Sequence, residues 1–307
     1  MNIISKLCCT AVMVFTCQQA YADCVVGGNS NQNLGAFSSA SISTGIIETS
    51  FSSDFSCSGF VNLLNFSEID ATLVGADFQL TAANGDAVPY TLYTAPERSD
   101  PFTLNETVSF GSFNLLDLLG LFGDDGTIPI YLSTGTANVG VGTYNDTISI
   151  LWQWDYCSGI GLLGICLGRD NGSATVMINV QLSVTESCSV QTSDVSLGTV
   201  SYLGSAHSAI LPLDINCTKQ LSYQYYVDGG DNFNAGQRNM AFNSETIAYK
   251  ITTTDGNTLI GPDLSASVAG IGVGNNQAFQ FLVETLVEDR FPLPGVYRDR
   301  VRVIVEF

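Results

Sequence analysis

The sequence predicts an all-β protein: two tandem immunoglobulin-like antiparallel β-sandwiches, the second lacking its final strand. Three observations lead to this prediction. Apolar residues alternate with polar ones at period two, turn motifs such as "ANGD", "DDG" and "TDGN" come at short intervals, and one set of landmarks occurs twice. Period-two alternation places apolar side chains on one face of a strand. Short strands separated by frequent turns are typical of sandwiches.

The duplication is visible in four landmarks that repeat in the same order. They are Cys24 to Gly35 and Cys188 to Gly198, the next cysteines Cys57 and Cys217, the tyrosines of "VPYTLYT" (Tyr90) and "IAYKITT" (Tyr249), and the segments "GTYNDTISILWQW" and "GVYRDRVRVIVEF". The last two segments align without gaps at a constant offset of 153 residues. The repeat predicts two domains, at 23–186 and 187–307.

The first 22 residues have the pattern of a cleaved secretory signal peptide. Lys6 precedes an apolar stretch, and the small-residue motif Ala20-Tyr21-Ala22 precedes Asp23. The whole chain has 10 Lys and Arg against 29 Asp and Glu, a net charge of −19. Such an acidic balance argues against nucleic acid and anionic membranes as partners. We therefore expect an exported protein.

Removing the signal segment leaves six cysteines in an oxidising compartment, which predicts three disulfides. The repeat symmetry pairs Cys24 with Cys57 and Cys188 with Cys217, and leaves Cys157 with Cys166. Connectivity taken from sequence alone is a hypothesis.

The second copy has no counterpart of one strand of the first. The first copy continues past Trp154 with "SATVMINVQLSVT" (Ser173–Thr185), which alternates as a strand, whereas Phe307 aligns with Trp154. A sandwich without its closing strand exposes a groove and invites pairing with a strand from another chain. The residues expected to accept that strand are Val301, Val303, Val305 and Phe307. Two alternatives stay open: the second domain closes with its own strands, or Ser173–Thr185 fills its groove.

These landmarks, together with "QRNM" at Arg238 and the terminal "PGVYRDRVRVIVEF", resemble the spore coat protein U domain family, which includes the archaic chaperone–usher pilins. The resemblance implies no cofactor and no catalysis. It implies a periplasmic pilus chaperone, an outer-membrane usher and an adjacent pilin that donates a strand as partners. Only Asp23 would precede Cys24 in the mature chain, so this subunit would accept a strand and have none to donate. That expectation places it at the tip of a fimbrium on the cell surface.

Three apolar segments occur only in the first copy, and we expect them to be exposed and to bind surfaces. Their apolar residues are Phe60, Leu63 and Leu64; Leu115, Leu116, Leu118, Leu119, Leu121 and Phe122; and Ile160, Leu162, Leu163 and Ile165. They resemble the hydrophobic fingers of Csu-type adhesins, which implies attachment to apolar surfaces or a host ligand and biofilm formation. Alternatively, the second segment forms a helical lid, the first is a core strand, or the third packs on neighbouring loops.

Other candidate sites are less favoured by the sequence. His207 is the single histidine and has no carboxylate beside it, and no catalytic motif occurs, so we expect no enzyme. "DGGDNFN" from Asp228 fits a glycine-rich turn better than a calcium loop, and no metal is expected. Trp152 and Trp154 could stack on sugars, but their alternation favours core positions. A structural pilin, a spore-coat-like subunit and a glycan-binding lectin remain the alternative functions.

Overall fold

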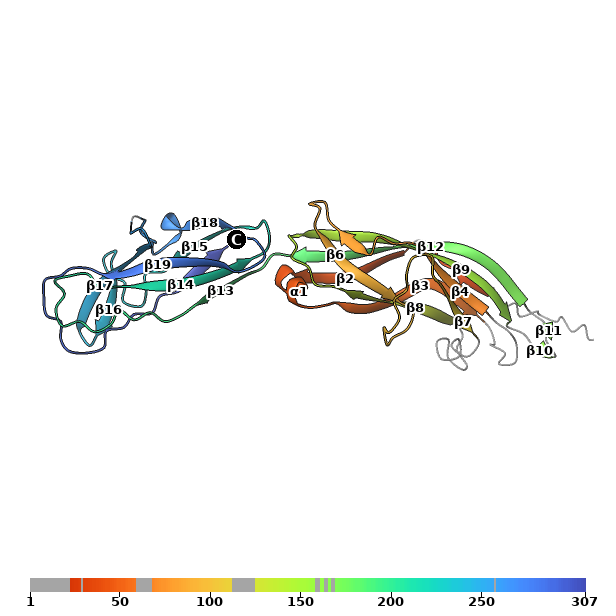
Figure 1. Cartoon of the computed structure of the whole chain (residues 1–307), viewed down its shortest axis with the longest axis horizontal. Helices are drawn as coiled ribbons and strands as arrows, with labels where there is room; N and C mark the ends of the chain where they lie inside the picture. Colours follow the sequence, from red (N-terminus) through yellow and green to blue (C-terminus); the bar gives the residue numbers. More distant parts are fainter. Residues whose placement is uncertain are drawn as a thin grey trace, which may run out of the picture.

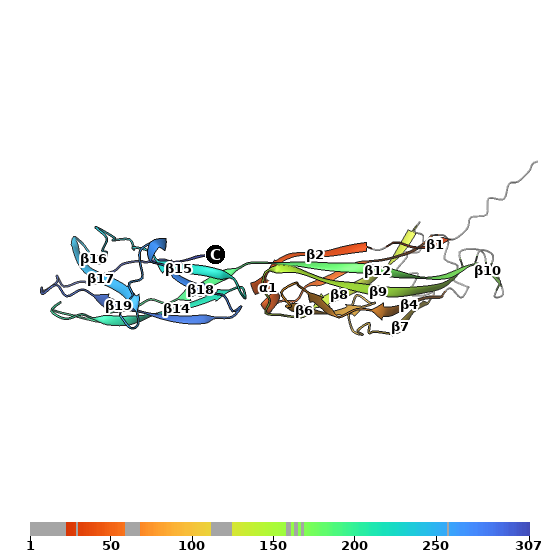
Figure 2. The same cartoon turned by 90° about the horizontal axis from the view of Figure 1, so that it is seen from above.

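The structure, a computed structural model, describes residues 23–28, 30–58, 68–111, 125–157, 161–162, 165–166, 169–256 and 258–307. The prediction of an all-β fold is confirmed. The helices within these ranges are α1 (Ser39–Thr44) and the 3₁₀ turn η1 (Leu264–Ala266), and neither has the length and apolar character that a membrane span requires. The strands fall into two groups that lie end to end along the long axis of the molecule (Figures 1 and 2). We call these groups the N-terminal and C-terminal units.

One ten-stranded sheet forms most of the N-terminal unit. Its strands are β1 (Asp23–Val26), β2 (Ser30–Ser38), β3 (Glu48–Ser58), β4 (Glu68–Gly75), β5 (Gln79–Thr81), β6 (Ala87–Tyr93), β7 (Thr107–Gly111), β8 (Asp125–Thr134), β9 (Gly142–Cys157) and β12 (Arg169–Thr185). The order is β1-β3-β8-β6-β5-β9-β12-β2, and β4 joins β9 to β7. A separate hairpin consists of β10 (Gly161–Leu162) and β11 (Ile165–Cys166).

Strand β12 completes the N-terminal unit. It pairs antiparallel with β9 along its whole length and parallel with β2. Its alternating residues Val176, Ile178, Val180 and Leu182 are at most 1% exposed. The alternative in which Ser173–Thr185 fills the groove of the second domain is therefore wrong, because its backbone hydrogen bonds and its apolar face are both used within the N-terminal unit.

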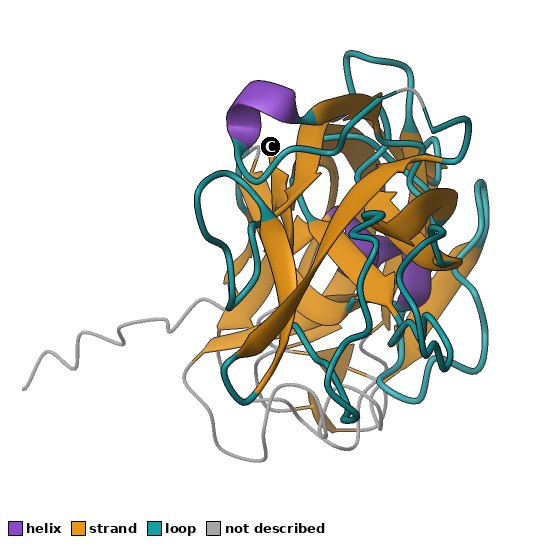
Figure 3. Cartoon of the chain, turned by 90° about the vertical axis from the view of Figure 1, so that its left-hand side faces the viewer, coloured by secondary structure: helices purple, strands orange, loops and turns teal. Residues whose placement is uncertain are grey.

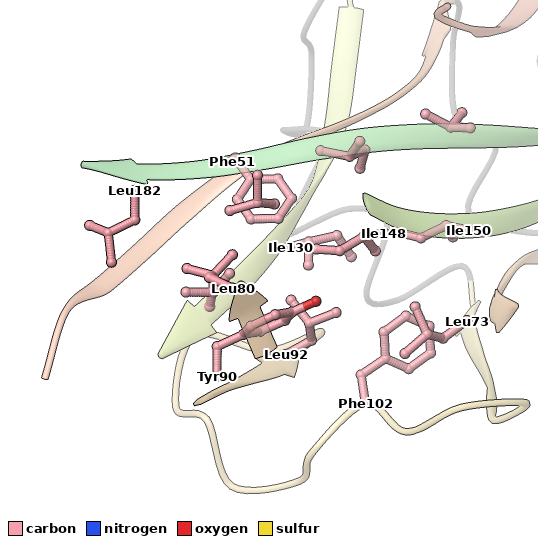
Figure 4. Packing of buried hydrophobic residues seen from close by; sticks show 14 of the residues in the cluster. Phe51, Leu73, Leu80, Tyr90, Leu92, Phe102, Ile130, Ile148, Ile150 and Leu182 are labelled. Carbon is pink, nitrogen blue, oxygen red and sulfur yellow. The ribbon is translucent and has the colours of Figure 1, made fainter. Parts of the chain in front are cut away.

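The core of the N-terminal unit is enclosed by the ten-stranded sheet, which folds around it. The apolar residues of β3, β4, β6, β8, β9 and β12 alternate toward it, as the close view in Figure 4 shows for Phe51, Ile130 and Ile148. Trp152 is fully buried and stacks on Phe55 with ring centroids 4.6 Å apart. The prediction that Trp152 is a core residue is confirmed.

The C-terminal unit has two smaller sheets. The first has the order β13 (Cys188–Thr192), β14 (Ser208–Cys217), β19 (Gln277–Thr285), β17 (Glu245–Thr253) and β16 (Arg238–Phe242), and the second has the order β18 (Val268–Ile271), β15 (Ser222–Val227) and β20 (Val303–Glu306). A separate core cluster lies here, with Tyr225, Ile215 and Phe281 among its buried members. Figure 3 looks along the molecule from the C-terminal unit, with the strands of both units roughly along the line of sight.

Equivalent hydrogen bonds occur in both units, in agreement with the duplication. The Tyr90 hydroxyl donates to Asp146 Oδ2 at 2.6 Å, and the Tyr249 hydroxyl donates to Asp299 Oδ2 at 2.6 Å. The two aspartates stand at the repeat offset of 153 residues. Burial, followed by the adjacent carboxylate, raises the pKa of both tyrosines well above its usual value. Both phenols therefore remain protonated donors.

A second repeated contact fixes the turn before β9 and β20. The Tyr144 hydroxyl donates to the Gly140 carbonyl at 2.7 Å, and the Tyr297 hydroxyl donates to the Leu293 carbonyl at 3.1 Å. Each tyrosine thus bonds to the backbone four residues upstream, the geometry of the tyrosine corner of immunoglobulin-like sandwiches.

One of the three expected disulfides is confirmed, between Cys188 and Cys217. The backbone register of β1 and β3 places Cys24 opposite Cys57. The side chains of Cys24, Cys57, Cys157 and Cys166 lie outside what the structure describes, so those two bridges remain predictions.

Candidate strand-acceptor and surface-binding sites

Strand β20 is an edge strand within the described part of the chain. It pairs with β15 on one side, through Val303 to Glu306, and with no described strand on the other. Val301, Val303 and Val305 pack against the C-terminal core but are only partly buried, and Phe307 is 56% exposed. An edge strand with accessible apolar side chains is a ready partner for another strand.

The corresponding residues of the N-terminal unit have a different environment. At the repeat offset, Ile148, Ile150 and Trp152 of β9 occupy the positions of Val301, Val303 and Val305, and all three are 0% exposed. Strand β12 pairs with β9 there and covers these side chains. The described C-terminal unit has no strand at the equivalent place, and residues 193–207, which follow β13 as β2 follows β1, contain none.

An open depression of about 850 Å³ lies on the three-stranded sheet, beside the C-terminal end of β20. Its lining residues are Ser222, Tyr223, Gln224, Ala269, Gly270, Ile271, Glu306 and Phe307. Ile271 is 63% exposed, so the depression has an apolar side next to Phe307. The predicted acceptor residue Phe307 therefore lies at an accessible surface.

The predicted surface-binding residues fall almost entirely outside the described residues. Nothing is described for Phe60, Leu63, Leu64, Leu115, Leu116, Leu118, Leu119, Leu121, Phe122, Ile160 and Leu163, and only the backbone is described for Leu162 and Ile165. The backbones of Leu162 and Ile165 pair across the β10–β11 hairpin. The question of a helical lid or an exposed loop at Phe113–Phe122 therefore lies outside the described residues.

The described strand ends nevertheless show where the chain leaves and re-enters the sheet. Around the first two segments, Ser58 pairs with Asp125, and Glu68 pairs with Gly111. Glu68 also pairs with Asp155, close to the end of β9.

The third segment begins at the same place, because Cys157 at the end of β9 pairs with Arg169 at the start of β12. All three segments are therefore attached at one end of the N-terminal unit, which we call the head end. In Figure 1 the head end points away from the C-terminal unit.

Charged side chains of β9 and β12 lie at the head end. Arg169 donates through Nε and Nη2 to both carboxylate oxygens of Asp155, and these hydrogen bonds hold the pKa of Asp155 below its usual value. The Trp154 indole Nε1 donates to Asp170 Oδ2 at 3.0 Å. Trp154 is thus held by a hydrogen bond and only partly buried, in contrast to Trp152.

The backbone of His207 and the segment from Asp228 take part in local hydrogen bonding. The His207 amide donates to Thr285 Oγ1 at 2.9 Å, and the Thr285 amide donates to the His207 carbonyl. Asp228 Oδ1 accepts from the amides of Gly230 and Arg302, and Gly230 has a φ of +86°, so this segment is a turn as predicted. No described group of three or more His, Cys, Asp and Glu residues could hold a metal ion.

Sequence reasoning missed the contacts between the two units. Lys219 Nζ forms an ion pair with Asp86 Oδ1 at 2.5 Å, and the hydroxyls of Ser39 and Thr218 lie 2.5 Å apart in a buried position. These residues are more than 130 positions apart, and no short motif marks them. They can be found only from the structure, which brings them together where the two units meet, a region we call the junction.

Comparison with known proteins identifies relatives of both halves. The sequence profile of the Spore Coat Protein U domain matches residues 9–151 and 174–304. No curated protein sequence matches the chain. Among solved structures, the chain is similar to the CsuC-CsuE chaperone-tip adhesion subunit pre-assembly complex from archaic chaperone-usher Csu pili of Acinetobacter baumannii, with 20% identity, a TM-score of 0.63, and coverage of 93% of this chain and 100% of that one. The CupB6 tip adhesin from Pseudomonas aeruginosa matches at 9% identity, covering 92% of this chain and 94% of that one, with a TM-score of only 0.36.

Proposed function

The chain belongs to the Spore Coat Protein U domain family, and we propose that it is the tip adhesin of a chaperone–usher pilus. In this proposal the C-terminal unit (187–307) is a pilin domain that accepts a β-strand. The N-terminal unit (23–186) is an adhesin domain. The fold shared with the Csu complex supports this proposal, and the observation that carries it is the difference in burial between β20 and β9.

Strand acceptance follows from the geometry of β20. A donor strand that bonded to the free edge of β20 would satisfy its unpaired backbone groups. It would also cover Val301, Val303 and Val305, as β12 covers their counterparts in the N-terminal unit. A periplasmic chaperone would supply this strand first, and an adjacent pilin would replace it after passage through the usher. Phe307 would be covered at the same time.

Adhesion would come from the head end. The three segments attached there contain the apolar residues named above, and two to four aliphatic side chains docked on an apolar surface contribute about 1.5 to 3 kcal/mol each. Several pili on one cell would add avidity. The protein would then act at the cell surface and promote attachment and biofilm formation.

The lectin alternative loses its main support from the aromatic residues. Trp152 is fully buried, and the Trp154 ring is partly covered with its Nε1 hydrogen-bonded. Sugar stacking requires an exposed aromatic face. These two residues therefore do not favour a glycan-binding site.

The experiment that tests strand acceptance uses the mature chain and a synthetic peptide with the sequence of Ser173–Thr185. This peptide is the strand that fills the equivalent position in the N-terminal unit. We expect it to slow amide hydrogen exchange in β20 and to raise the melting temperature, because it pairs with the free edge. A peptide of scrambled order is the control. If exchange in β20 is already as slow as in β9 without any peptide, the acceptor proposal is wrong.

A further inference from the structure

The end of the C-terminal unit opposite the junction carries an exposed apolar surface. It is formed by residues 286–296, the first part of the connection between β19 and β20, which we call the basal loop. Its residues Val287, Phe291, Leu293 and Val296 are 59%, 77%, 54% and 65% exposed. Four large apolar residues exposed within one loop are a candidate interaction site, since exposed apolar patches mark such sites. In Figure 1 this end of the molecule points away from the N-terminal unit.

The basal loop is held in a defined conformation. The Leu203 amide donates to the Arg290 carbonyl at 2.9 Å, and the Arg290 side chain pairs with Glu245 and Glu288. The rings of Tyr202 and Phe291 lie 4.8 Å apart. A loop fixed in this way loses little conformational freedom on binding.

The repeat shows what the equivalent loop of the N-terminal unit does. The tyrosine corners place Leu293 at the position of Gly140, because each carbonyl accepts the hydroxyl of the tyrosine four residues later. Gly140 forms a β-bridge with Lys219 of the C-terminal unit. Asn138 Nδ2 donates to the Val273 carbonyl of that unit at 3.0 Å. In the N-terminal unit, therefore, this loop contacts the next unit in line.

The two loops differ in chemistry. Thr285 and Thr134 are equivalent, since each exchanges two hydrogen bonds with one partner, His207 or Ile47. Leu293 stands eight positions after Thr285, whereas Gly140 stands six positions after Thr134, and the longer loop carries the exposed apolar residues Val287, Phe291 and Leu293. A junction within one chain is held by the covalent backbone, so polar contacts suffice. A junction between separate chains has no covalent link, so apolar burial adds to its stability.

We propose that the basal loop docks on the head end of the following subunit of the fibre, a domain of the same fold that presents loops equivalent to 218–219 and 271–274. Phe291 and Leu293 would be the central contacts. The inference rests on the proposed function, because it needs a fibre that continues beyond the C-terminal unit. It adds a second contact between subunits to the donated strand.

The test places a photo-crosslinking amino acid at Phe291 in the full chain and irradiates isolated pili. Leu104, which is 46% exposed on the N-terminal unit, is the control position. We expect position 291, and not position 104, to crosslink to another Spore Coat Protein U domain subunit, identified by mass spectrometry. A chain that is absent from pili overturns the proposed function and the docking with it. A chain present in pili that forms no subunit crosslink from 291, or crosslinks only to a chaperone or to a second copy of itself, overturns the docking alone.

A second measurement uses the variant Phe291→Ser with Leu293→Ser. Its melting temperature should match the parent, since exposed substitutions change stability little. The rate at which the chain is lost from sheared pili should rise by roughly thirtyfold, the factor for the loss of one aromatic hot spot. An unchanged rate of loss would contradict the docking.

Discussion

The head end of the N-terminal unit and the end of the C-terminal unit that contacts the N-terminal unit are built from equivalent strand ends but differ in the segments that follow them. In the C-terminal unit, the segments after β14 and before β19 are short, and Lys219 and Val273 within them contact the N-terminal unit. In the N-terminal unit, the corresponding segments are residues 59–67 and 112–124, which are longer and lie outside the described residues. Equivalent ends of the repeated fold therefore carry short segments that contact the other unit in one case and longer sequences rich in apolar residues in the other.

A second contrast concerns the edge of β9, which β12 pairs with, and the edge of β20, which pairs with no described strand. Strand β12 leaves Trp152 0% exposed, whereas the equivalent Val305 of β20 is only partly buried. Equivalent strand positions thus differ in burial, and a neighbouring strand is described beside only one of them.

Truncation to Ala at the equivalent positions 152 and 305 should give the largest difference in the free energy of unfolding between the two units. Trp152→Ala should lower the free energy of unfolding of the N-terminal unit by about 3 to 5 kcal/mol, because it leaves a cavity beside Phe55. Val305→Ala should cost the C-terminal unit less than about 2 kcal/mol, the lower end for buried aliphatic side chains. Denaturation followed by peptide-level hydrogen exchange measures both. Equal costs would show that β20 is as well covered as β9.

Removing the Cys188–Cys217 bridge should destabilise the fold more than removing the predicted Cys157–Cys166 bridge. Replacing both Cys188 and Cys217 by Ala should cost about 2 to 5 kcal/mol, because the bridge joins β13 to β14 at the start of the unit. The same replacement of Cys157 and Cys166 should spare the fold and reduce attachment. Peptide mapping should find Cys24 bridged to Cys57. A bridge between the units would contradict the repeat.

The two buried tyrosines should make the protein sensitive to alkaline pH. Their raised pKa means that the folded state keeps the phenolic protons where the unfolded state, with a pKa of about 10, loses them. Stability is therefore fully present below about pH 10 and falls as the pH rises further. The double variant with Phe at Tyr90 and Tyr249 should lose about 1 to 3 kcal/mol per site at pH 7 and show a flatter alkaline profile. A parallel alkaline loss in both proteins would refute this assignment.

The ion pair at the junction should contribute modestly. Lys219→Ala should cost about 0.2 to 1 kcal/mol, since the pair is partly exposed. Burial opposes ionisation of Asp86, but hydrogen bonds from Lys219 and the Gly140 amide together hold its pKa below the usual value. Its contribution is thus present above about pH 4 and is lost as the pH falls further. Thermal melts of parent and variant should converge at acid pH.

The head-end leucines should affect stability least. Changing Leu162 and Leu163 to Ser should leave the free energy of unfolding within about 0.5 kcal/mol if both are exposed, while attachment to polystyrene falls sharply. A loss of about 2 to 5 kcal/mol per site would place them in a core instead. Attachment should persist in 1 M salt, where charges are screened beyond about 3 Å.

Most strands, the duplication and the Cys188–Cys217 pairing could be predicted from the amino-acid pattern. The alternation through Ile148, Ile150 and Trp152 predicts a buried strand face because side chains in a strand point alternately to opposite sides. The repeated cysteines correctly predict the Cys188–Cys217 bridge. These features depend on short-range periodicity and on a copied pattern, both of which a linear sequence carries.

Only the tertiary structure decided where Ser173–Thr185 belongs, because a strand with alternating apolar residues fits any open edge until its partners β9 and β2 are known. The same holds for the contacts of Asp86 with Lys219 and for the exposure of Phe291. Each of these depends on which distant segments meet when the chain packs. Local propensity carries no information about such meetings, because the free energy that selects them comes from burial and hydrogen bonding across the whole unit.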